Sequence, residues 1–230
     1  AKVPTVRAFL IRRLAQTGET PILDKLIEQT LTKDAKPADQ LAVLREMNEG
    51  LKGRRKVEMP KSWSAAFASI VASPDADVRS QAMSLAISFG DPTAVEAQRR
   101  ILNDAKAAPG ARLDALQALV KVSDPKLAPS LQTLVGDETL GAAAVRSLAA
   151  YDDPKTPEVL LGAFDKMSAD LKRDALATLC SRPAYADALL AAVEQKKLPS
   201  AALTADLITQ LRNLKQPSLN ERIGKVWGRS

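Results

Sequence analysis

The chain has 230 residues, of which 46% are hydrophobic, 3% aromatic and 26% charged, with a formal net charge of +6. It has no histidine and one cysteine. This excludes histidine-dependent nucleophilic sites, histidine-ligated zinc or haem, intrachain disulfides and thiolate metal cages. Its apolar residues are mostly Ala and Leu, which favour helices over strands, so we expect an all-α protein.

The basic excess lies at the two ends of the chain. The net charge is +5 over residues 1–61, −2 over 62–205 and +3 over 206–230. A protein that binds a long duplex carries a continuous basic stripe, so nucleic acid is disfavoured as a partner. No run of 18 apolar residues is present, so we expect a soluble chain without a membrane span. The absence of an initiator Met suggests a fragment of a larger protein.

The strongest signal is an internal repeat. Each copy reads apolar, basic, x, x, Ala, x, x, x, Leu or Ala, and the Ala positions are 33, 29 and 31 residues apart. The copies cover 78–86, 111–119, 140–148 (with Gly141 at the basic position) and 171–179, with a weaker first copy at 6–14. A period near 30 is typical of a solenoid unit of two helices and two short turns.

Turn residues divide the repeats in the same way. Asp91, Asp124 and Asp153 each precede a proline, which ends one helix and suits the first turn of the next. We interpret all three aspartates as structural. The capping-box spacing is matched by Thr93 with Glu96 and by Ser218 with Glu221.

Apolar periodicity then predicts the helices. First helices are expected near 21–32, 62–73, 93–106, 126–135, 156–166 and 183–195. Second helices are expected near 4–16, 38–51, 77–89, 110–122, 139–150, 169–181 and 200–213, with a last helix at 218–227. Because one pair buries too little apolar surface to be stable alone, we predict a single α-solenoid domain over 1–230, an elongated right-handed α-α superhelix of about six to seven helix pairs.

The run from Asp75 to Ala82 resembles the second helix of HEAT repeats, where an acid precedes Val-Arg and an Ala follows. The matching basic position is occupied by Arg7, Arg112 and Lys172 in other copies. The resemblance implies an armadillo-like solenoid in which this basic residue pairs with an acid of a neighbouring turn. Such ion pairs would form a ladder along the stack.

The stretch from Ser218 to Gly228 resembles the helical region of large membrane-bound dehydrogenases predicted in planctomycetes and verrucomicrobia. In that family HEAT-like repeats lie between a propeller and a C-terminal haem c domain. The resemblance implies an extracytoplasmic (periplasmic) spacer between redox modules, within a parent protein that is a dehydrogenase-like enzyme. The haem-attaching Cys-x-x-Cys-His is absent, so we expect no cofactor in this chain.

The densest charge cluster is the sharpest candidate for a binding site. Lys52, Arg54, Arg55 and Lys56 lie in an insertion at 52–61, which Gly and Pro mark as a surface loop. It is interpreted either as a loop that docks an acidic surface, phosphate or anionic lipid, or, as we favour, as a solvated mobile insertion.

Two tryptophans complete the candidate partner-binding set. Trp63 follows the basic insertion, where an exposed ring would stack on a base, although packing against a neighbouring helix is the favoured interpretation. Trp227 is a candidate contact with a downstream domain.

Other reactive groups are assigned structural roles. We interpret Cys180 as a buried, inert side chain. The acidic pairs Asp75/Asp77, Asp137/Glu138 and Asp152/Asp153 are interpreted as helix caps in preference to a metal or acid-base site. No catalytic, cofactor or metal residue is predicted.

The sequence therefore predicts a non-enzymatic repeat scaffold or inter-domain spacer. It would contact a protein partner, or neighbouring domains of the same chain, through its concave face or the basic insertion. The alternative is a HEAT-like DNA-binding protein or DNA glycosylase, which the scattered aromatics and the acidic central repeats disfavour.

Overall fold

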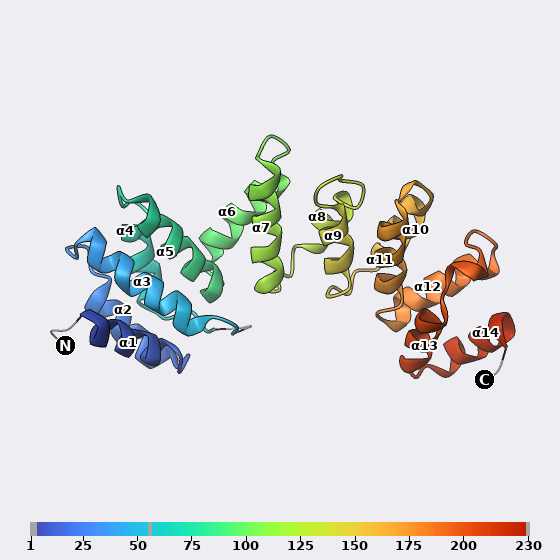
Figure 1. Cartoon of the computed structure of the whole chain (residues 1–230), viewed down its shortest axis with the longest axis horizontal. Coiled ribbons are helices and arrows are strands. Elements are labelled where there is room, and N and C mark those ends of the chain that lie inside the picture. Colours follow the sequence, from blue (N-terminus) through green and yellow to red (C-terminus); the bar gives the residue numbers. More distant parts are fainter. Residues whose placement is uncertain (1–3, 55–56, 229–230) are drawn as a thin grey trace. The chain divides into compact units, whose positions relative to one another are not determined.

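The structure is a computed structural model that describes residues 4–54 and 57–228. Regular structure in these residues is entirely helical (Figure 1), which confirms the all-α prediction. In chain order, the helices up to residue 121 are α1 (Pro4–Ala15), α2 (Thr20–Thr30), α3 (Pro37–Leu51), α4 (Trp63–Ile70), α5 (Ala76–Phe89), α6 (Pro92–Asn103) and α7 (Pro109–Lys121). There follow α8 (Ala128–Thr133), α9 (Gly141–Leu148), α10 (Thr156–Ala163), the 3-10 helix η1 (Phe164–Lys166), α11 (Ala169–Leu179), α12 (Pro183–Glu194), the 3-10 helix η2 (Ser200–Ala202), α13 (Ala205–Asn213) and α14 (Pro217–Trp227).

The helices lie where the periodicity predicted them, with one exception. The helix expected at 200–213 is interrupted, because Leu203 has an extended backbone and is buried. Thr204 then takes the N-cap position, and α13 begins at Ala205.

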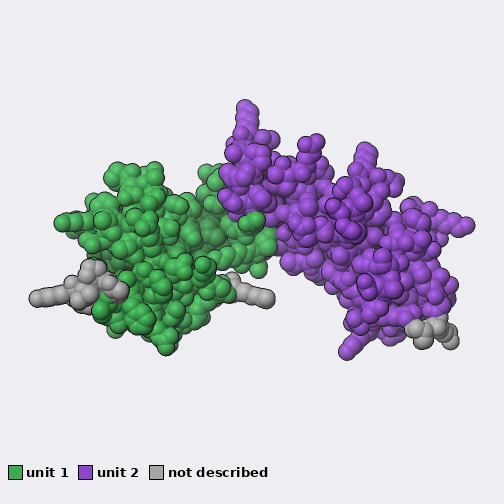
Figure 2. Space-filling model, in the orientation of Figure 1, with its two compact units in different colours: residues 1–101, 117–124 green, residues 102–116, 125–230 purple. Residues whose placement is uncertain are grey.

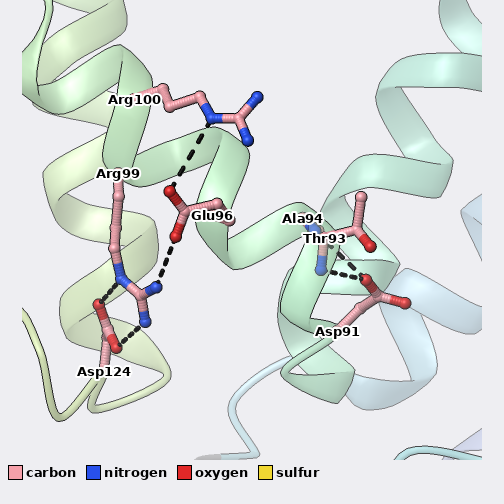
Figure 3. Close-up of polar contacts among 7 residues, drawn as sticks. All are labelled: Asp91, Thr93, Ala94, Glu96, Arg99, Arg100 and Asp124. Carbon is pink, nitrogen blue, oxygen red and sulfur yellow. Dashed lines mark hydrogen bonds and ion pairs between the residues drawn. The ribbon is translucent and has the colours of Figure 1, made fainter.

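The two predicted capping boxes are wrong. Asp91 caps α6 instead, because its carboxylate accepts hydrogen bonds from the backbone N–H of Thr93 at 2.9 Å and of Ala94 at 3.2 Å (Figure 3). Ser218 likewise lies inside α14, which begins at Pro217. A proline at the first helical position makes the preceding residue the N-cap, so Thr93 and Ser218 each lie two residues after the N-cap position.

The chain divides into two compact units (Figure 2). Unit 1 comprises residues 1–101 and 117–124, and unit 2 comprises 102–116 and 125–230. The single domain predicted over 1–230 stays a prediction, and so does a continuous superhelix.

Unit 1 contains two rows of helices. α3 packs between α1 and α5, while α2 packs against α4. The rows are joined where α1 contacts α2 and where α4 contacts α5. Leu44, Met47, Trp63 and Leu85 are fully buried in this unit.

Unit 2 also contains two rows of helices. α9 packs on α11 in one row, and α8, α10, α12 and α14 follow one another in the second. α8 contacts α9, and α11 contacts α12, so these contacts join the rows. Leu148, Leu160, Tyr185 and Leu189 are fully buried here. In each unit, therefore, like helices of successive repeats lie next to one another.

Polar bonds connect successive repeats in unit 1. The side-chain amide of Asn48 donates to the backbone oxygen of Gln81 at 2.9 Å, and Arg45 pairs with Asp77 at 3.1 Å. Both bonds join α3 to α5, which lie one repeat apart.

Unit 2 has equivalent bonds, two of them to backbone oxygens. The Thr178 hydroxyl donates to the Val145 oxygen at 2.9 Å, and the Tyr185 hydroxyl donates to the Tyr151 oxygen at 2.6 Å. Each spans 33 or 34 residues. The bonds fix the register between repeats, because buried polar groups keep their partners in the folded state.

The predicted ladder of basic residues is only partly present. Arg7 lies 4.0 Å from Asp39 in unit 1, and Arg112 lies 3.3 Å from Asp137 in unit 2. The other two copies use different contacts: Arg79 donates to backbone oxygens of its own turn, while the ammonium of Lys172 lies 5.5 Å from the ring centre of Phe164.

Candidate partner-binding surface

The described residues of the basic insertion, 52–54 and 57–61, lie outside the helices, as predicted, and the exposed side chain of Arg54 is hydrogen-bonded to the protein. Its guanidinium donates to the backbone oxygens of Gln16 at 2.5 Å and Thr17 at 2.9 Å. These carbonyls follow the last residue of α1, where basic groups are favourable. Lys52 is exposed and lies 3.7 Å from Glu49. Arg55 and Lys56 lie outside the described residues.

The far end of the loop is fixed to unit 1. Val57 and Pro60 are buried. The Asp24 carboxylate accepts hydrogen bonds from the backbone N–H of Ser62 at 2.9 Å and from its hydroxyl at 2.7 Å. These bonds lower the pKa of Asp24, the backbone bond most strongly. The prediction that the insertion is wholly solvated is therefore wrong for the described part of the loop.

The two tryptophans differ in burial. Trp63 is fully buried, with its ring centre 5.5 Å from that of Phe67 and 5.1 Å from that of Phe89. The packing interpretation of Trp63 is correct, and its place in the candidate partner-binding set is withdrawn. Trp227 is half-buried in unit 2, where its indole N–H donates to the Ser200 oxygen at 3.3 Å.

The structure reveals an apolar surface that the sequence analysis missed. Val6, Phe9, Leu10 and Leu14 are 48%, 66%, 48% and 42% exposed, respectively. Their spacing of i, i+3, i+4 and i+8 places them on one side of α1. We refer to these four residues as the α1 apolar face. A cluster of exposed large apolar side chains marks an interaction site far more often than a single one does.

The repeat alignment explains why this face is unusual. Leu10 occupies the position of the repeated Ala, and Leu14 the position of the final Leu or Ala. The inner copies at those two positions are all fully buried: Ala82, Ala115, Ala144 and Ala175 at the first, and Ala86, Leu119, Leu148 and Leu179 at the second. A large Leu where the other copies carry Ala is the sequence signal that identifies this face.

A partly buried ion pair lies elsewhere in unit 1 (Figure 3). Arg99 binds both oxygens of Asp124, at 2.7 Å through Nε and 2.5 Å through Nη2. Arg99 also binds Glu96 at 2.8 Å, and the bond to Asp124 is the main cause of its raised pKa. With both oxygens of Asp124 bound by the guanidinium, the pair holds α6 to the turn after α7, which is a structural role.

Described residues of unit 2 line at least two pockets. One, of about 420 Å³, lies between α10, η1 and α12 and is lined largely by small and aliphatic residues with Glu158, Asp165 and Lys197. The other, of about 710 Å³, includes Asp137 and Arg146. Asp137 accepts hydrogen bonds from the backbone N–H of Thr139 and Leu140, so it caps the turn before α9 as predicted.

Cys180 is fully buried, as predicted, and burial raises the pKa of its thiol to about 12, so the thiol is protonated at neutral pH. Within residues 4–54 and 57–228, no three His, Cys, Asp or Glu side chains lie close enough to hold a metal ion.

No protein-family model matches the chain, and no curated protein matches it. No helix in the described part of the chain has the length and apolar character needed to cross a membrane.

Proposed function

We propose that the chain is a HEAT-like helical-repeat scaffold that binds a partner protein without catalysing a reaction itself. The α1 apolar face is the observation that carries this proposal. Phe9 is 66% exposed, and its three apolar neighbours on α1 are also exposed. Solvating such a cluster is unfavourable, and covering it releases roughly 25 cal/mol for each Å² of apolar surface removed from water.

Repeat architecture supports the same function. In each unit, helices of successive repeats lie side by side and are joined by bonds such as Asn48 to Gln81 and Thr178 to Val145. Stacked repeats gain stability from their neighbours, so an apolar face that no described helix covers is suited to contact another protein or another part of the same chain. Such faces are commonly used for protein binding. In a dehydrogenase-like parent, the same scaffold would act as the spacer between neighbouring domains.

The basic loop contributes to this surface in the proposal. Arg54 lies at the C-terminal end of α1, the helix that carries the apolar face. Together with Arg13 it gives the end of this face a positive charge. The proposed surface thus combines an apolar centre with a basic rim, which is the usual anatomy of a protein interface.

The test is affinity capture from an extract of the source organism, with the bound proteins identified by mass spectrometry. We expect the unchanged chain and a Val71→Ser control to retain the same partner, whereas Phe9→Ser loses it. Val71 is a suitable control because it is also an exposed apolar residue of unit 1. The DNA-binding alternative is tested by titrating the unchanged chain with duplex DNA at low salt. Tight duplex binding with no captured protein would overturn the scaffold proposal.

A further inference from the structure

We infer that the cavity of about 420 Å³ in unit 2 binds an alkylammonium group, that is, a positively charged primary amine on a short apolar chain. We refer to this cavity, which α10, η1, α12 and the turn after α12 line, as the α10–α12 pocket. Its residues all belong to unit 2 and none belongs to α1. The inference therefore goes beyond the scaffold function and does not depend on it.

The pocket forms where α10 packs against α12. The first wall continues from α10 into η1, and its residues share one face through the spacing i, i+3, i+4 and i+7: Glu158, Leu161, Gly162 and Asp165. The second wall has the same spacing and mostly small side chains: Ala188, Ala191, Ala192 and Gln195. Short side chains on both facing walls leave a space between two helices that are otherwise in contact.

Gly162 keeps part of this space open. A Cβ built at Gly162 would meet no atom within 4 Å, and its φ is not in the left-handed region. Neither the backbone nor close packing therefore requires glycine here, although alanine would make a more stable helix. The side chains of Phe164, Ala192 and Leu198 are buried and give the pocket an apolar surface. Pockets for small ligands have volumes of about 300–1,000 Å³, so a short alkyl chain fits.

The charged residues of the pocket indicate which head group the ligand carries. Glu158, Asp165 and Lys197 are exposed, and within residues 4–54 and 57–228 none of them forms an ion pair. Two acids and one base give the pocket a net charge of −1. Lys197 lies in the turn after α12, where its backbone N–H donates to the Ala192 oxygen at 2.9 Å. A cation is therefore favoured over an anion, and the ammonium group would lie beside Glu158 or Asp165.

Other ligands fit the pocket less well. The pocket offers a metal ion two carboxylates, and no group of three metal-ligating side chains lies in the described part of the chain. An anion would be attracted by Lys197 but repelled by both acids. In the larger pocket of unit 2, Arg146 already pairs with Asp174 at 2.7 Å. Charge thus gives the larger pocket no equally clear preference.

The experiment compares three ligands that share one alkyl chain: hexylamine, 1-hexanol and hexanoate. Their binding to the full chain is followed by the amide shifts of the ¹⁵N-labelled protein. We expect hexylamine to bind about threefold more tightly than hexanol, and hexanoate to bind most weakly. The amides of Gly162 and Leu198 should be among those that shift. Butylamine should bind about tenfold more weakly than hexylamine, because it buries two fewer methylenes.

Filling the pocket tests its location. Gly162→Leu should weaken hexylamine binding at least about tenfold, because the new side chain occupies the space of the alkyl chain. Gly110→Leu is the matched control, since Gly110 is also a helical glycine with no atom within 4 Å of a built Cβ. Unchanged hexylamine binding in a Gly162→Leu variant that keeps its helical circular dichroism would overturn the inference.

Charge variants test the head group, and they decide the question if Gly162→Leu does not fold. The double change of Glu158→Gln with Asp165→Asn should abolish the preference for hexylamine over hexanol, whereas Glu138→Gln, at an exposed acid outside the pocket, should preserve it. Lys197→Gln should strengthen hexylamine binding about twofold, because it removes a repulsive charge. Equal binding of hexylamine and hexanol to the unchanged chain, or a preference that survives the double change, would overturn the inference.

A final ligand distinguishes two sources of the alkylammonium group. Nα-acetyl-lysine methylamide carries the group as the side chain of a peptide unit. Binding as tight as that of hexylamine would assign the pocket to a lysine side chain of another protein, and weaker binding would assign it to a free amine. Both results support the amine chemistry. Affinity capture that depends on Phe9 tests the scaffold proposal separately, because Phe9 is not part of this pocket.

Discussion

At the scale of single residues, Asp124 illustrates how a turn residue holds two helices. Its side chain is 1% exposed, while that of Arg99 is 20% exposed. The bidentate bond leaves Arg99 a second partner in Glu96, which is half-exposed. Removing the buried partner of such a pair is costly, because the remaining charge loses its compensation, whereas an exposed pair contributes little.

We therefore predict that Asp124→Ala lowers the free energy of unfolding by about 2–3 kcal/mol, less than for a fully buried pair because solvent still reaches Arg99. The matched change Glu96→Ala should cost less than about 1 kcal/mol. Urea denaturation of both variants measures the difference. Equal losses of unfolding free energy in the two variants would contradict the larger contribution that we assign to Asp124.

The lowered pKa of Asp137 predicts how the stability of the chain depends on pH. Hydrogen bonds from the backbone N–H of Leu140 and Thr139, together with the Arg112 guanidinium, lower the pKa of Asp137. A carboxylate with a lowered pKa stabilises the folded chain above its unfolded pKa of about 4, and this stabilisation is lost as the pH falls through its folded pKa.

Asp137→Asn should accordingly be about 1 kcal/mol less stable than the unchanged chain at pH 7. The difference in unfolding free energy between the unchanged chain and the variant should become smaller at pH 3 and below, because Asp137 becomes protonated in the unchanged chain. Denaturation at pH 7 and pH 2.5 measures it, with Glu138→Gln as the control for an exposed neighbouring carboxylate. A gap that is constant with pH would contradict this account.

At the scale of helices, α1 and α3 approach closely at Gly50. A Cβ built at Gly50 would lie 2.7 Å from the Ala15 Cβ and 2.7 Å from the Arg12 backbone oxygen. Neither is the end of a flexible side chain, so the two helices would have to move apart. Glycine is required here by space, since its backbone angles are those of an ordinary helix residue.

Gly50→Ala should therefore destabilise unit 1 by about 1–3 kcal/mol, although alanine is the better helix former. Gly162 is the matched control, because it lies in α10 with no atom within 4 Å of a built Cβ. Gly162→Ala should be neutral or stabilise the chain by roughly 0.5–1 kcal/mol. Thermal unfolding of the two variants in parallel measures this. A stabilised Gly50→Ala would mean that α1 is not held against α3.

Element positions were largely predictable from the sequence, and their surroundings were less so. The apolar period and the Asp-Pro turns located the helices, because both are local properties of the chain. The burial of Trp63 depends on Phe67 and Phe89, of which Phe89 belongs to a different helix, so position along the chain did not decide it. The contact of Arg54 with Gln16 joins residues 38 apart in the sequence, so it could not be predicted from the sequence either.

The candidate site shows the same division. The basic loop was visible as a charge cluster, but it forms no surface with Trp63, which is buried. The α1 apolar face was missed because a large apolar residue in a helix is normally interpreted as a buried core residue. Only the comparison of Leu10 with the buried Ala of other copies separates an uncovered face from a core position.

At the scale of the whole molecule, each of the two units consists of helices packed in two rows, and α1 carries an apolar face that no described helix covers. Repeat proteins open in parts, because each repeat depends mainly on its neighbours, whereas a single closed core opens as one cooperative body. Helices with covered faces, such as α3 and α9, should therefore be more protected than α1.

Native-state hydrogen exchange, read helix by helix, tests this claim most directly. We predict opening free energies that differ by at least about 2 kcal/mol along the chain, with α1 among the least protected helices and α3 well above it. A single shared opening free energy for all slowly exchanging amides, α1 included, would contradict the account, because it would show that the chain unfolds as one core in which α1 does not open independently.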